Sequence, residues 1–505
     1  MESSNSKRVL KNTLSLYVRT AVLTIVSLYT SRVVLASLGV DDYGIQNVVG
    51  GFVSMFGFIS GTLSNATQRY FALDLAQGDW ERVNKTYSIN LVIYMAFILV
   101  ILIISETVGL WFVLNVLNFD RARVIAAVVV YECAIISFLF MMFVTPYIAL
   151  LTADENLSIY SAVSVFEAVL KLTAVFLLTI VNVDKLIFYS VAIAFMGISV
   201  NLFYYIYAKV KYKKLKFALC RDVSKYTDIF AFQGWNLIGA IASVLKAQGI
   251  NIVINIFFGT AINAARGIAV TVNGAINSFA SNFMKAVDPQ ITKAYGAGEQ
   301  ERFKKLIYTS SKMTFALLFI ISAPVIYDAE YILSLWLGHV PDYAVIFVRL
   351  ALIDAIIYSI TDSIGTAVQS VGKIKIYQLV VGGMLLLNVP LSYFFLKINN
   401  NVLIPFYVAI ILSIVGSIGR IICLAYIYSF NIMEYMRYVI LPIILSTGIV
   451  IIGLSCIDVF ASNFILLVRN VFCIMFVTGV LIYILVLDRD EKKFLLDIVR
   501  RKLNL

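Results

Sequence analysis

Four of the basic residues inside the long apolar stretches of this sequence, where an ionised side chain is costly, are our candidates for a functional site. They are Arg19, Arg32, Lys246 and Arg266. A charge at the centre of a lipid bilayer costs about 2.5–3.5 kcal/mol on insertion scales, so such residues usually have a functional role. Guanidinium groups bind phosphate oxygens through paired hydrogen bonds. We therefore predict that these side chains line a hydrated, cationic cavity that attracts an anion. The alternative is that Arg19 and Arg32 extend to the lipid headgroups.

Asparagines accompany the two central basic residues, Lys246 and Arg266. They are Asn251, Asn255, Asn273 and Asn277. An amide both donates and accepts hydrogen bonds, so these side chains suit the hydroxyl groups of a sugar. The alternative is that they bond one membrane helix to another.

Three acidic residues inside apolar stretches are candidates for ion coupling. They are Glu132, Asp354 and Asp362. Asp354 and Asp362 lie eight residues apart, close to two helical turns, and so share one helix face. They could neutralise the positive charge of Arg349 or exchange a proton during transport, and both interpretations stay open. We predict H⁺ or Na⁺ as the coupling ion. We expect no resident metal or other cofactor, because the chain has one histidine, His339, and five scattered cysteines.

The composition indicates which medium surrounds these residues. The chain has 505 residues, of which 61% are hydrophobic and 14% are charged. Soluble domains contain about 45–50% apolar and about 25% charged residues. A soluble core could not bury this much apolar surface. The chain is therefore predicted to lie in a lipid bilayer.

Fourteen apolar stretches are long enough to cross a membrane, which requires about 20 residues per helix. They cover approximately 12–38, 43–66, 87–114, 123–151, 157–182, 186–208, 229–258, 261–287, 306–327, 342–370, 374–396, 402–428, 435–457 and 463–487. Lipid cannot satisfy an open strand edge, so the spans must be helices. We predict an all-α integral membrane protein with 14 transmembrane helices.

Lysines and arginines concentrate in both termini and in most even-numbered connections between these stretches. The odd-numbered connections are poorer in basic residues, and some are acidic, as in "GVDDYG". Cytoplasmic loops are enriched in basic residues, so both termini are predicted to be cytoplasmic. The fourth connection, "LTADENLS", is an acidic exception. The net charge of +11 mostly reflects this topology, and we expect no nucleic-acid binding.

Two similar polar stretches indicate an internal repeat. "GDWERVNK" begins at Gly78 and "GEQERFKK" at Gly298, which is 220 residues later. Gly39 and Gly259 differ by the same 220 residues, and each precedes the second helix of its half. Six spans separate the copies, so both point the same way, as in two-lobed transporters. Chance similarity of two polar loops is the alternative.

The repeat predicts two pseudo-symmetric six-helix lobes. The predicted parts are an N-terminal lobe (1–208), a basic cytoplasmic linker (209–228), a C-terminal lobe (229–428), two additional transmembrane helices (429–487) and a basic cytoplasmic tail (488–505).

The start of the chain resembles a known family. The stretch "LSLYVRTAVLTIVSLYTSRVVLASLGVDDYGIQNVVGG" places a polar, Arg-bearing helix before L-G-x-x-x-Y-G and a glycine-rich helix, and "NATQRYFALDLAQGD" follows. With the 6 + linker + 6 + 2 organisation, this resembles the polysaccharide exporters of the MATE-like, or MOP, superfamily. Within that superfamily it is most similar to Wzx-type lipid-linked oligosaccharide flippases.

The resemblance implies a function in bacterial polysaccharide biosynthesis, such as that of O-antigen and lipopolysaccharide, or of capsule. A protein of this type would flip an undecaprenyl-diphosphate-linked oligosaccharide from the inner to the outer leaflet of the cytoplasmic membrane by alternating access. The resemblance implies the lipid-linked oligosaccharide, membrane lipids and other polysaccharide-assembly proteins as partners. We expect a monomer.

Two other classes of protein remain as alternatives. A MATE-type exporter of cationic drugs would need acidic residues in its cavity, whereas the spans around Arg19, Lys246 and Arg266 are basic. A membrane polymerase or ligase usually presents a large outer loop with catalytic residues, and the predicted outer connections here are short. We therefore expect a transporter rather than an enzyme.

Overall fold

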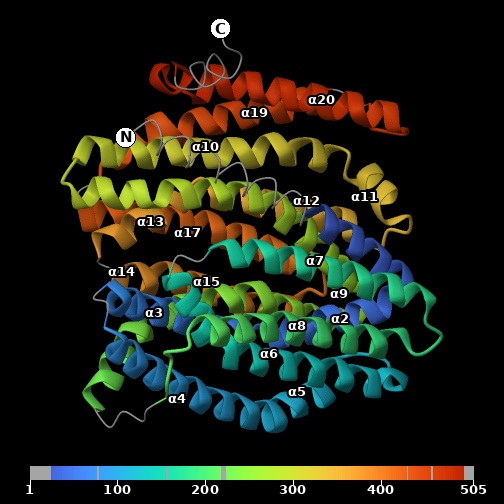
Figure 1. Cartoon of the computed structure of the whole chain (residues 1–505). Helices are drawn as coiled ribbons and strands as arrows, with labels where there is room; N and C mark the ends of the chain where they lie inside the picture. Colours follow the sequence, from blue (N-terminus) through green and yellow to red (C-terminus); the bar gives the residue numbers. More distant parts are fainter. Residues whose placement is uncertain are drawn as a thin grey trace. The chain divides into compact units, whose positions relative to one another are not determined.

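The computed structural model describes residues 24–76, 79–154, 157–217, 223–372, 374–428, 430–456 and 459–493. Every regular element in these ranges is a helix, and none of them contains a strand (Figure 1). The chain divides into two compact units. Each unit combines segments that are distant in the sequence, and the two are described separately below.

The first unit to consider contains Tyr29–Gly267 and Leu385–Pro405. Its elements are most of the helix Thr24–Leu38, then α2 (Val40–Ser54), α3 (Gly57–Ala76), α4 (Trp80–Ile104), the π-helical turn η1 (Ser105–Gly109), α5 (Leu110–Asn115), η2 (Arg121–Arg123), α6 (Val124–Ala153), α7 (Leu157–Ile180), α8 (Lys185–Lys211), the first part of α9 (Val223–Gly296) and α16 (Asn388–Ile398). We call it the α6 unit.

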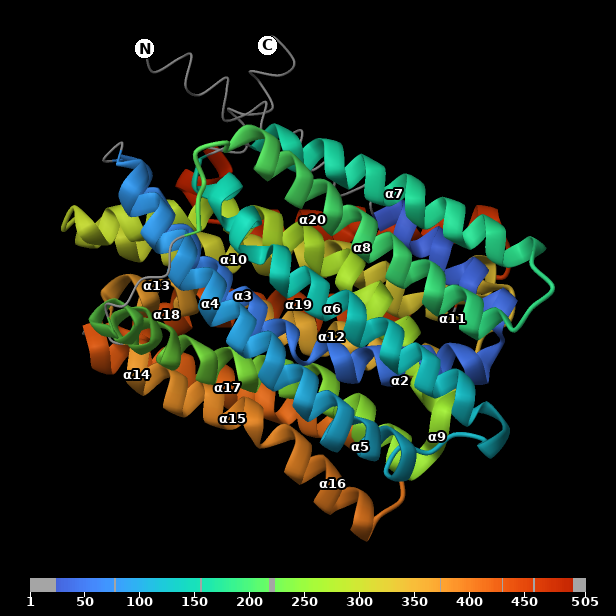
Figure 2. The ribbon, with the colours of Figure 1, turned by 60° about the horizontal axis from the view of Figure 1, so that its bottom comes forward.

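Helix α6 is the centre of this unit. It packs against α2, α3, α4 and α8, and it runs beside α8 in Figure 2. Its sequence is almost continuously apolar, so every side of the helix can be buried against a neighbour. Val130, Tyr131 and Met142 of α6 are fully buried with Val48 of α2 and Ile93 of α4.

The second unit contains Met1–Leu28, Ile268–Met384 and Phe406–Leu505. Its described elements are the start of the helix Thr24–Leu38, the second part of α9, then α10 (Gln300–Tyr327), α11 (Ala329–Leu337), α12 (Ala344–Ser359), α13 (Asp362–Val371), α14 (Ile374–Tyr377), η3 (Gln378–Gly382), most of α17 (Ile404–Tyr428), α18 (Ile432–Tyr435), η4 (Met436–Ile440), α19 (Leu441–Ser455), α20 (Phe464–Leu481) and η5 (Ile482–Val486). The short α15 (Gly383–Leu386) crosses the boundary between the units. We call the second unit the α10 unit.

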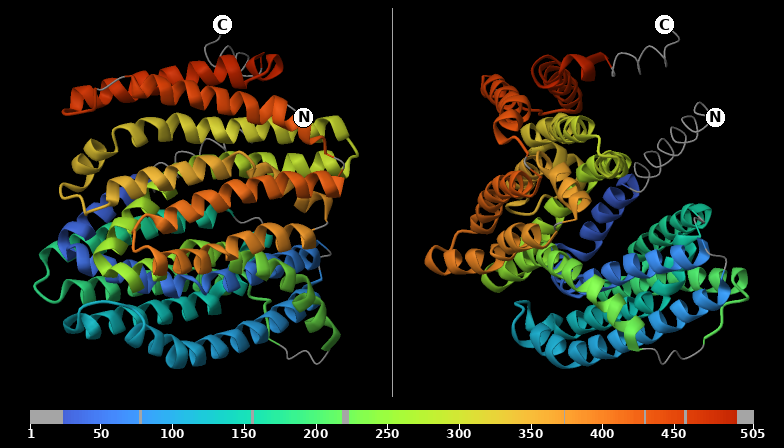
Figure 3. Two further views of the ribbon diagram at one scale, coloured as in Figure 1. Left: turned by 180° about the vertical axis from the view of Figure 1, so that it is seen from behind. Right: turned by 90° about the vertical axis from the view of Figure 1, so that its left-hand side faces the viewer.

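Helix α10 organises this unit. It contacts α12, α13 and α20, and α19 and α20 lie side by side next to it in Figure 3. A buried ion pair joins Lys312 Nζ of α10 to Glu491 Oε2, at 3.1 Å, and Thr309 Oγ1 donates to the other carboxylate oxygen of Glu491. The segment after η5 is therefore fixed to α10 by charge as well as by packing.

Ten of the described helical segments are long and apolar enough to cross a membrane. Many of their large apolar side chains, such as Phe195, Phe472 and Phe476, are exposed, as expected for surfaces that face lipid tails. The predicted all-helical membrane fold is confirmed. The count of fourteen spans and the cytoplasmic position of the termini stay predictions.

The helices differ from the predicted spans in continuity. The predicted span 43–66 is divided between α2 and α3 by a turn at Met55 and Phe56. The predicted boundary between the spans 229–258 and 261–287 agrees with the structure, since the helical conformation of α9 is interrupted at Gly259. Apolar length alone does not locate the break at Met55 and Phe56, because a break leaves the composition unchanged.

Two glycines of the predicted repeat, Gly39 and Gly259, have nearly the same backbone conformation. Gly39 has φ 80° and ψ 175°, and Gly259 has φ 77° and ψ −167°. Glycine adopts this conformation without steric cost, whereas residues with a Cβ rarely do. The second glycine pair cannot be compared, because Gly78 lies outside the described residues. The predicted lobe boundaries also stay a prediction, since each packing unit takes segments from both lobes.

Candidate functional site

The reversal at Gly259 brings predicted site residues of α9 together. Arg266 Nε donates to Asn251 Oδ1 at 2.5 Å, and Asn263 Nδ2 donates to the Asn251 carbonyl at 2.8 Å. Asn251 Nδ2 in turn donates to Gln248 Oε1 at 2.8 Å. Only 8% of the Arg266 surface is exposed. The Arg266 guanidinium thus lies in a cluster of amide side chains, which we call the amide cluster.

Asn255 has a different environment from Asn251, although we predicted a shared site. Its Oδ1 accepts from the backbone N–H of Asn118 at 2.6 Å, and its Nδ2 donates to the Asn118 carbonyl at 3.0 Å. The side chain is fully buried. Asn255 therefore binds the backbone of the connection between α5 and η2. Asn118 could not be identified from the sequence, because only its main chain takes part.

Asn273 and Asn277 lie further along α9, in the α10 unit, and Asn277 Nδ2 donates to Asn273 Oδ1. Of the other predicted cations, Arg32 has an exposed side chain on the helix Thr24–Leu38. Arg19 and the side chain of Lys246 lie outside the part of the chain that the structure describes. The shared cationic cavity stays a prediction: among the described site residues, Arg266 contacts Asn251, and Asn273 contacts Asn277.

The predicted coupling acids lie in separate surroundings. Glu132 of α6 forms a side-chain hydrogen bond with Glu106, which belongs to the π-helical turn η1. The two acidic side chains thus lie near one another, although they belong to different helices. Glu106 was missed by the sequence analysis, and its position one helix away from Glu132 could not be seen there.

Asp354 and Asp362 belong to the α10 unit, but a turn at 360–361 places Asp354 on α12 and Asp362 at the start of α13, so the prediction that they share one helix face is wrong. Ser413 Oγ donates to Asp354 Oδ1 at 2.5 Å. Asp362 interacts electrostatically with Arg420, whose guanidinium lies 3.9 Å from the centre of the Tyr358 ring. Arg349, the partner that we considered for both acids, donates instead to the carbonyls of Ile326 and Tyr327 at the end of α10.

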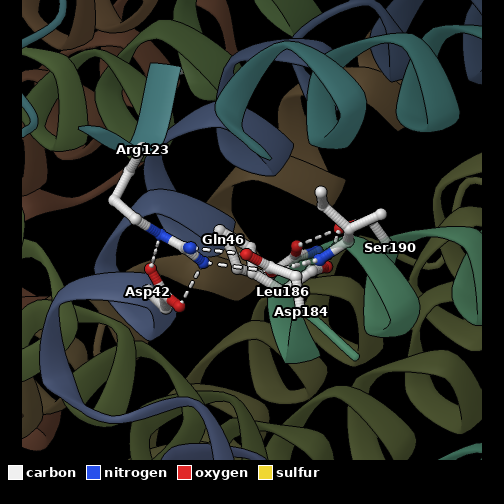
Figure 4. Close-up of polar contacts among 7 residues, drawn as sticks. Asp42, Gln46, Arg123, Asp184, Leu186 and Ser190 are labelled. Atoms are coloured by element: carbon white, nitrogen blue, oxygen red, sulfur yellow. Dashed lines mark hydrogen bonds and ion pairs between the residues drawn. The ribbon is translucent and has the colours of Figure 1, made fainter. Parts of the chain in front are cut away.

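An ion bridge that the sequence analysis did not identify joins three helix starts (Figure 4). Arg123 Nε and Nη2 donate to the two Asp42 oxygens at 2.8 and 2.6 Å. Arg123 Nη1 and Nη2 donate to the two Asp184 oxygens at 2.5 and 3.1 Å. Beside the bridge, Ser190 Oγ donates to Gln46 Oε1 at 3.3 Å. These residues precede or begin α2, α6 and α8, so one guanidinium fixes three helices at the same end of the α6 unit.

The bridge alters the ionisation of its aspartates. The hydrogen bonds from Arg123 lower the pKa of Asp184. At Asp42 burial has the larger effect and raises the pKa of the carboxyl, although Arg123 opposes this. The first, third and fifth predicted connections supply the three residues. The only signal for the bridge in the sequence was that these three connections are predicted to lie on the same side of the membrane.

Repeat-equivalent segments contact each other next to this bridge. A Cβ on Gly44 would lie 2.0 Å from the Thr260 carbonyl oxygen, and Thr260 Oγ1 donates to Asp41 Oδ1 at 3.1 Å. A Cβ on Gly267 would lie 2.7 Å from the side chain of Asn47, the residue 220 positions earlier. Equivalent positions of a two-fold repeat meet at its axis. The glycines thus allow the two copies to approach closely here.

Comparisons with known structures identify the fold. The structure titled as the lipid II flippase MurJ in an inward closed conformation matches with a TM-score of 0.70 and 12% identity, over 93% of this chain and 99% of that one. An inward-facing multidrug resistance MATE family transporter of the MOP superfamily matches with a TM-score of 0.61 and 15% identity, over 80% and 96%. The eukaryotic MATE transporter AtDTX14 matches with a TM-score of 0.56 and 12% identity, over 84% and 98%.

The chain therefore has the helical membrane fold that MurJ shares with MATE transporters. Within the sequence, residues 237–394 match the family model described as MatE. No curated protein sequence is significantly similar to the chain.

Proposed function

We propose that the chain is a transporter of the MOP superfamily that acts as a Wzx-type flippase. Its substrate is a lipid-linked oligosaccharide, with undecaprenyl diphosphate as the carrier, which it moves from the inner to the outer leaflet of a bacterial cytoplasmic membrane. The observation that carries the proposal is the buried Arg266 in its amide cluster. Guanidinium and amide groups together suit a diphosphate bound to sugars.

The electrostatics favour an anionic substrate. A positive charge in an apolar, water-poor surrounding attracts an anion more strongly than the same charge in bulk water. Arg19, Arg32 and Lys246 add to this attraction if they share the cavity with Arg266. The interior of a bacterial cell is negative, so outward movement gains about 2.3 kcal/mol per negative charge per 100 mV.

Alternating access needs one end of the transporter to open while the other is closed. The Asp41–Thr260 and Asn118–Asn255 contacts gather at the end that carries the odd-numbered connections, which we predict to be outside. We propose that these contacts belong to the state that loads substrate from the inside. Release to the outside then requires them to separate.

Return of a proton would supply further energy for the cycle. The Glu132–Glu106 pair is our candidate for the proton site, because two neighbouring acidic side chains favour protonation of one of them. A π-helical turn is frequent at functional sites, and η1 carries Glu106.

A MATE-type exporter of small molecules is the second candidate function. The MatE match at residues 237–394 and the MATE structures favour it. Deletion of the gene distinguishes the two functions. For the flippase, lipid-linked oligosaccharide accumulates in the inner leaflet of the mutant cells, and the wild-type gene restores its export. Unchanged levels of this lipid with increased drug sensitivity would contradict the flippase and support the exporter.

A further inference from the structure

We propose that a cavity between the helix Thr24–Leu38 and the second part of α9 binds hydroxyl groups of the sugar portion of the substrate. This inference rests on the proposed flippase function and assigns one part of its substrate to a defined site. We call the site the hydroxyl cavity. All of its lining residues belong to the α10 unit.

The hydroxyl cavity has a volume of about 360 Å³. It is lined by Thr24, Ser27, Leu28, Val270, Thr271, Gly274, Ala275 and Ser278. The volume falls within the range of about 300–1,000 Å³ that is typical of small-molecule sites. Four of these eight residues carry a hydroxyl group and none of the eight carries a charge. The lining therefore suits a neutral, hydroxyl-bearing group better than a phosphate or a cationic drug.

The hydroxyl groups of helical residues can receive hydrogen bonds from such a ligand. Ser278 Oγ donates to the Ala275 carbonyl of its own helix at 2.6 Å, which fixes its proton and leaves lone pairs on the oxygen. Each sugar hydroxyl can donate to such an oxygen. The small residues Gly274 and Ala275 between the hydroxyls let a ring approach the helix backbone.

At one position of the cavity, the equivalent residues of the predicted repeat are in close contact. A shift of 220 residues places Thr271 at Gly51 and Leu28 at Gln248. At that equivalent position a Cβ on Gly51 would lie 2.7 Å from Gln248 Oε1, so the corresponding space is occupied. At this position one copy of the predicted repeat holds the Gln248 side chain against Gly51, whereas Leu28 and Thr271 of the other copy line the hydroxyl cavity.

One wall of the cavity is also held in place. Trp336 Nε1 of α11 donates to the carbonyl of Leu28 at 2.8 Å. This bond restrains the helix Thr24–Leu38 beside the cavity and keeps the space from closing. A preorganised site loses less free energy when it binds its ligand.

The test measures binding to the full-length protein in lipid nanodiscs with two matched probes. The first probe is the pool of undecaprenyl-diphosphate-linked oligosaccharide extracted from cells that lack the transporter. The second is synthetic undecaprenyl diphosphate, which lacks the sugars. The variants are Thr271→Val with Ser278→Ala, which removes two hydroxyls at nearly constant shape, and Gly274→Leu, which fills the cavity.

Gly274 suits the filling variant because a Cβ there would meet no atom within 4 Å. Gly383→Leu is the matched control, since Gly383 is equally unobstructed but does not line the hydroxyl cavity. We expect the double variant to bind the sugar-bearing probe roughly tenfold more weakly, the effect of two lost neutral hydrogen bonds. Gly274→Leu should weaken binding of the sugar-bearing probe further. Binding of the sugar-free probe should change less than about twofold in both, and the control should match the wild type.

The outcomes separate this inference from the proposed function. If the wild type binds the sugar-bearing probe but both variants bind it equally well, the hydroxyl cavity is not a sugar site, although the flippase function stands. If the variants lose both probes equally, the cavity holds the lipid chain and the inference is again wrong. If the wild type binds neither probe, the proposed function fails and the inference fails with it.

Discussion

Arg123 bonds two carboxylates at the same time in the α6 unit. Its guanidinium makes paired hydrogen bonds with both Asp42 and Asp184. Only arginine has the planar arrangement of donors that two carboxylates can share in this way. We infer that Arg123 fixes the starts of α2, α6 and α8 relative to one another.

We predict that Arg123→Gln lowers the free energy of unfolding by about 1–2 kcal/mol, since two partly buried carboxylates lose their partner while solvent screens part of the loss. Thermal unfolding of the purified protein in detergent measures this effect. Arg123→Lys should be intermediate, because lysine keeps the charge without the paired geometry. Identical melting of the glutamine variant and the wild type would show that the bridge does not hold these helices together.

The lowered pKa of Asp184 predicts a pH dependence of stability. The bridge stabilises the fold fully above the ordinary aspartate pKa of about 3.9. The stabilisation is lost as the pH falls from there through the lower pKa of the folded state. The difference in melting temperature between the wild type and Asp184→Asn should therefore be largest near pH 7 and shrink towards pH 3. A difference that stays constant over this range would contradict the assignment.

At the scale of helices, the close contact of Gly44 with Thr260 is the tightest packing between the two copies of the repeat. We predict that Gly44→Val prevents this contact, since the added side chain meets backbone atoms that cannot move aside. The state that is closed at the predicted outer end should lose about 1–3 kcal/mol.

Labelling of Ala264→Cys, in a cysteine-free background, by a membrane-impermeant maleimide from outside the cell measures this closure, because Ala264 is fully buried one turn after Thr260 in this structure. We expect Gly44→Val to increase the labelling rate roughly tenfold, because 1.4 kcal/mol corresponds to a factor of ten. Gly50→Val is the matched control, since a Cβ there would lie 3.8 Å from its nearest neighbour. Equal rates for the two variants would mean that this contact does not close the outer end.

The sequence predicted helices far better than it predicted contacts between them. Apolar length identified the membrane helices, and the 220-residue spacing identified Gly39 and Gly259, because both signals are local. Asn118 and Glu106 gave no such signal, since their roles depend on which helix lies opposite. Arg266 and Asn251 could be predicted to share a site because a single tight turn connects their segments.

The whole molecule must couple its movement to an energy source if it transports against a gradient. We predict that Glu132→Gln abolishes any stimulation of transport by an inward proton gradient, because the pair with Glu106 then loses its titratable partner. Transport by reconstituted protein with and without the gradient measures this coupling. Wild-type transport that is indifferent to both proton and sodium gradients would refute ion coupling, while transport itself could persist.

The central claim concerns the substrate and the buried charge that attracts it. The most direct measurement is flipping of extracted undecaprenyl-diphosphate-linked oligosaccharide in proteoliposomes, detected by a sugar-specific reagent that cannot cross the membrane. We compare the wild type with Arg266→Gln and with Arg82→Gln, which changes an arginine on the protein surface. The account predicts flipping by the wild type and by Arg82→Gln, and a loss of at least about tenfold for Arg266→Gln inserted at normal levels, because a charge-assisted hydrogen bond contributes about 1.5–3 kcal/mol. Undiminished flipping by Arg266→Gln would contradict the role of this charge, and no flipping by the wild type would contradict the proposed function.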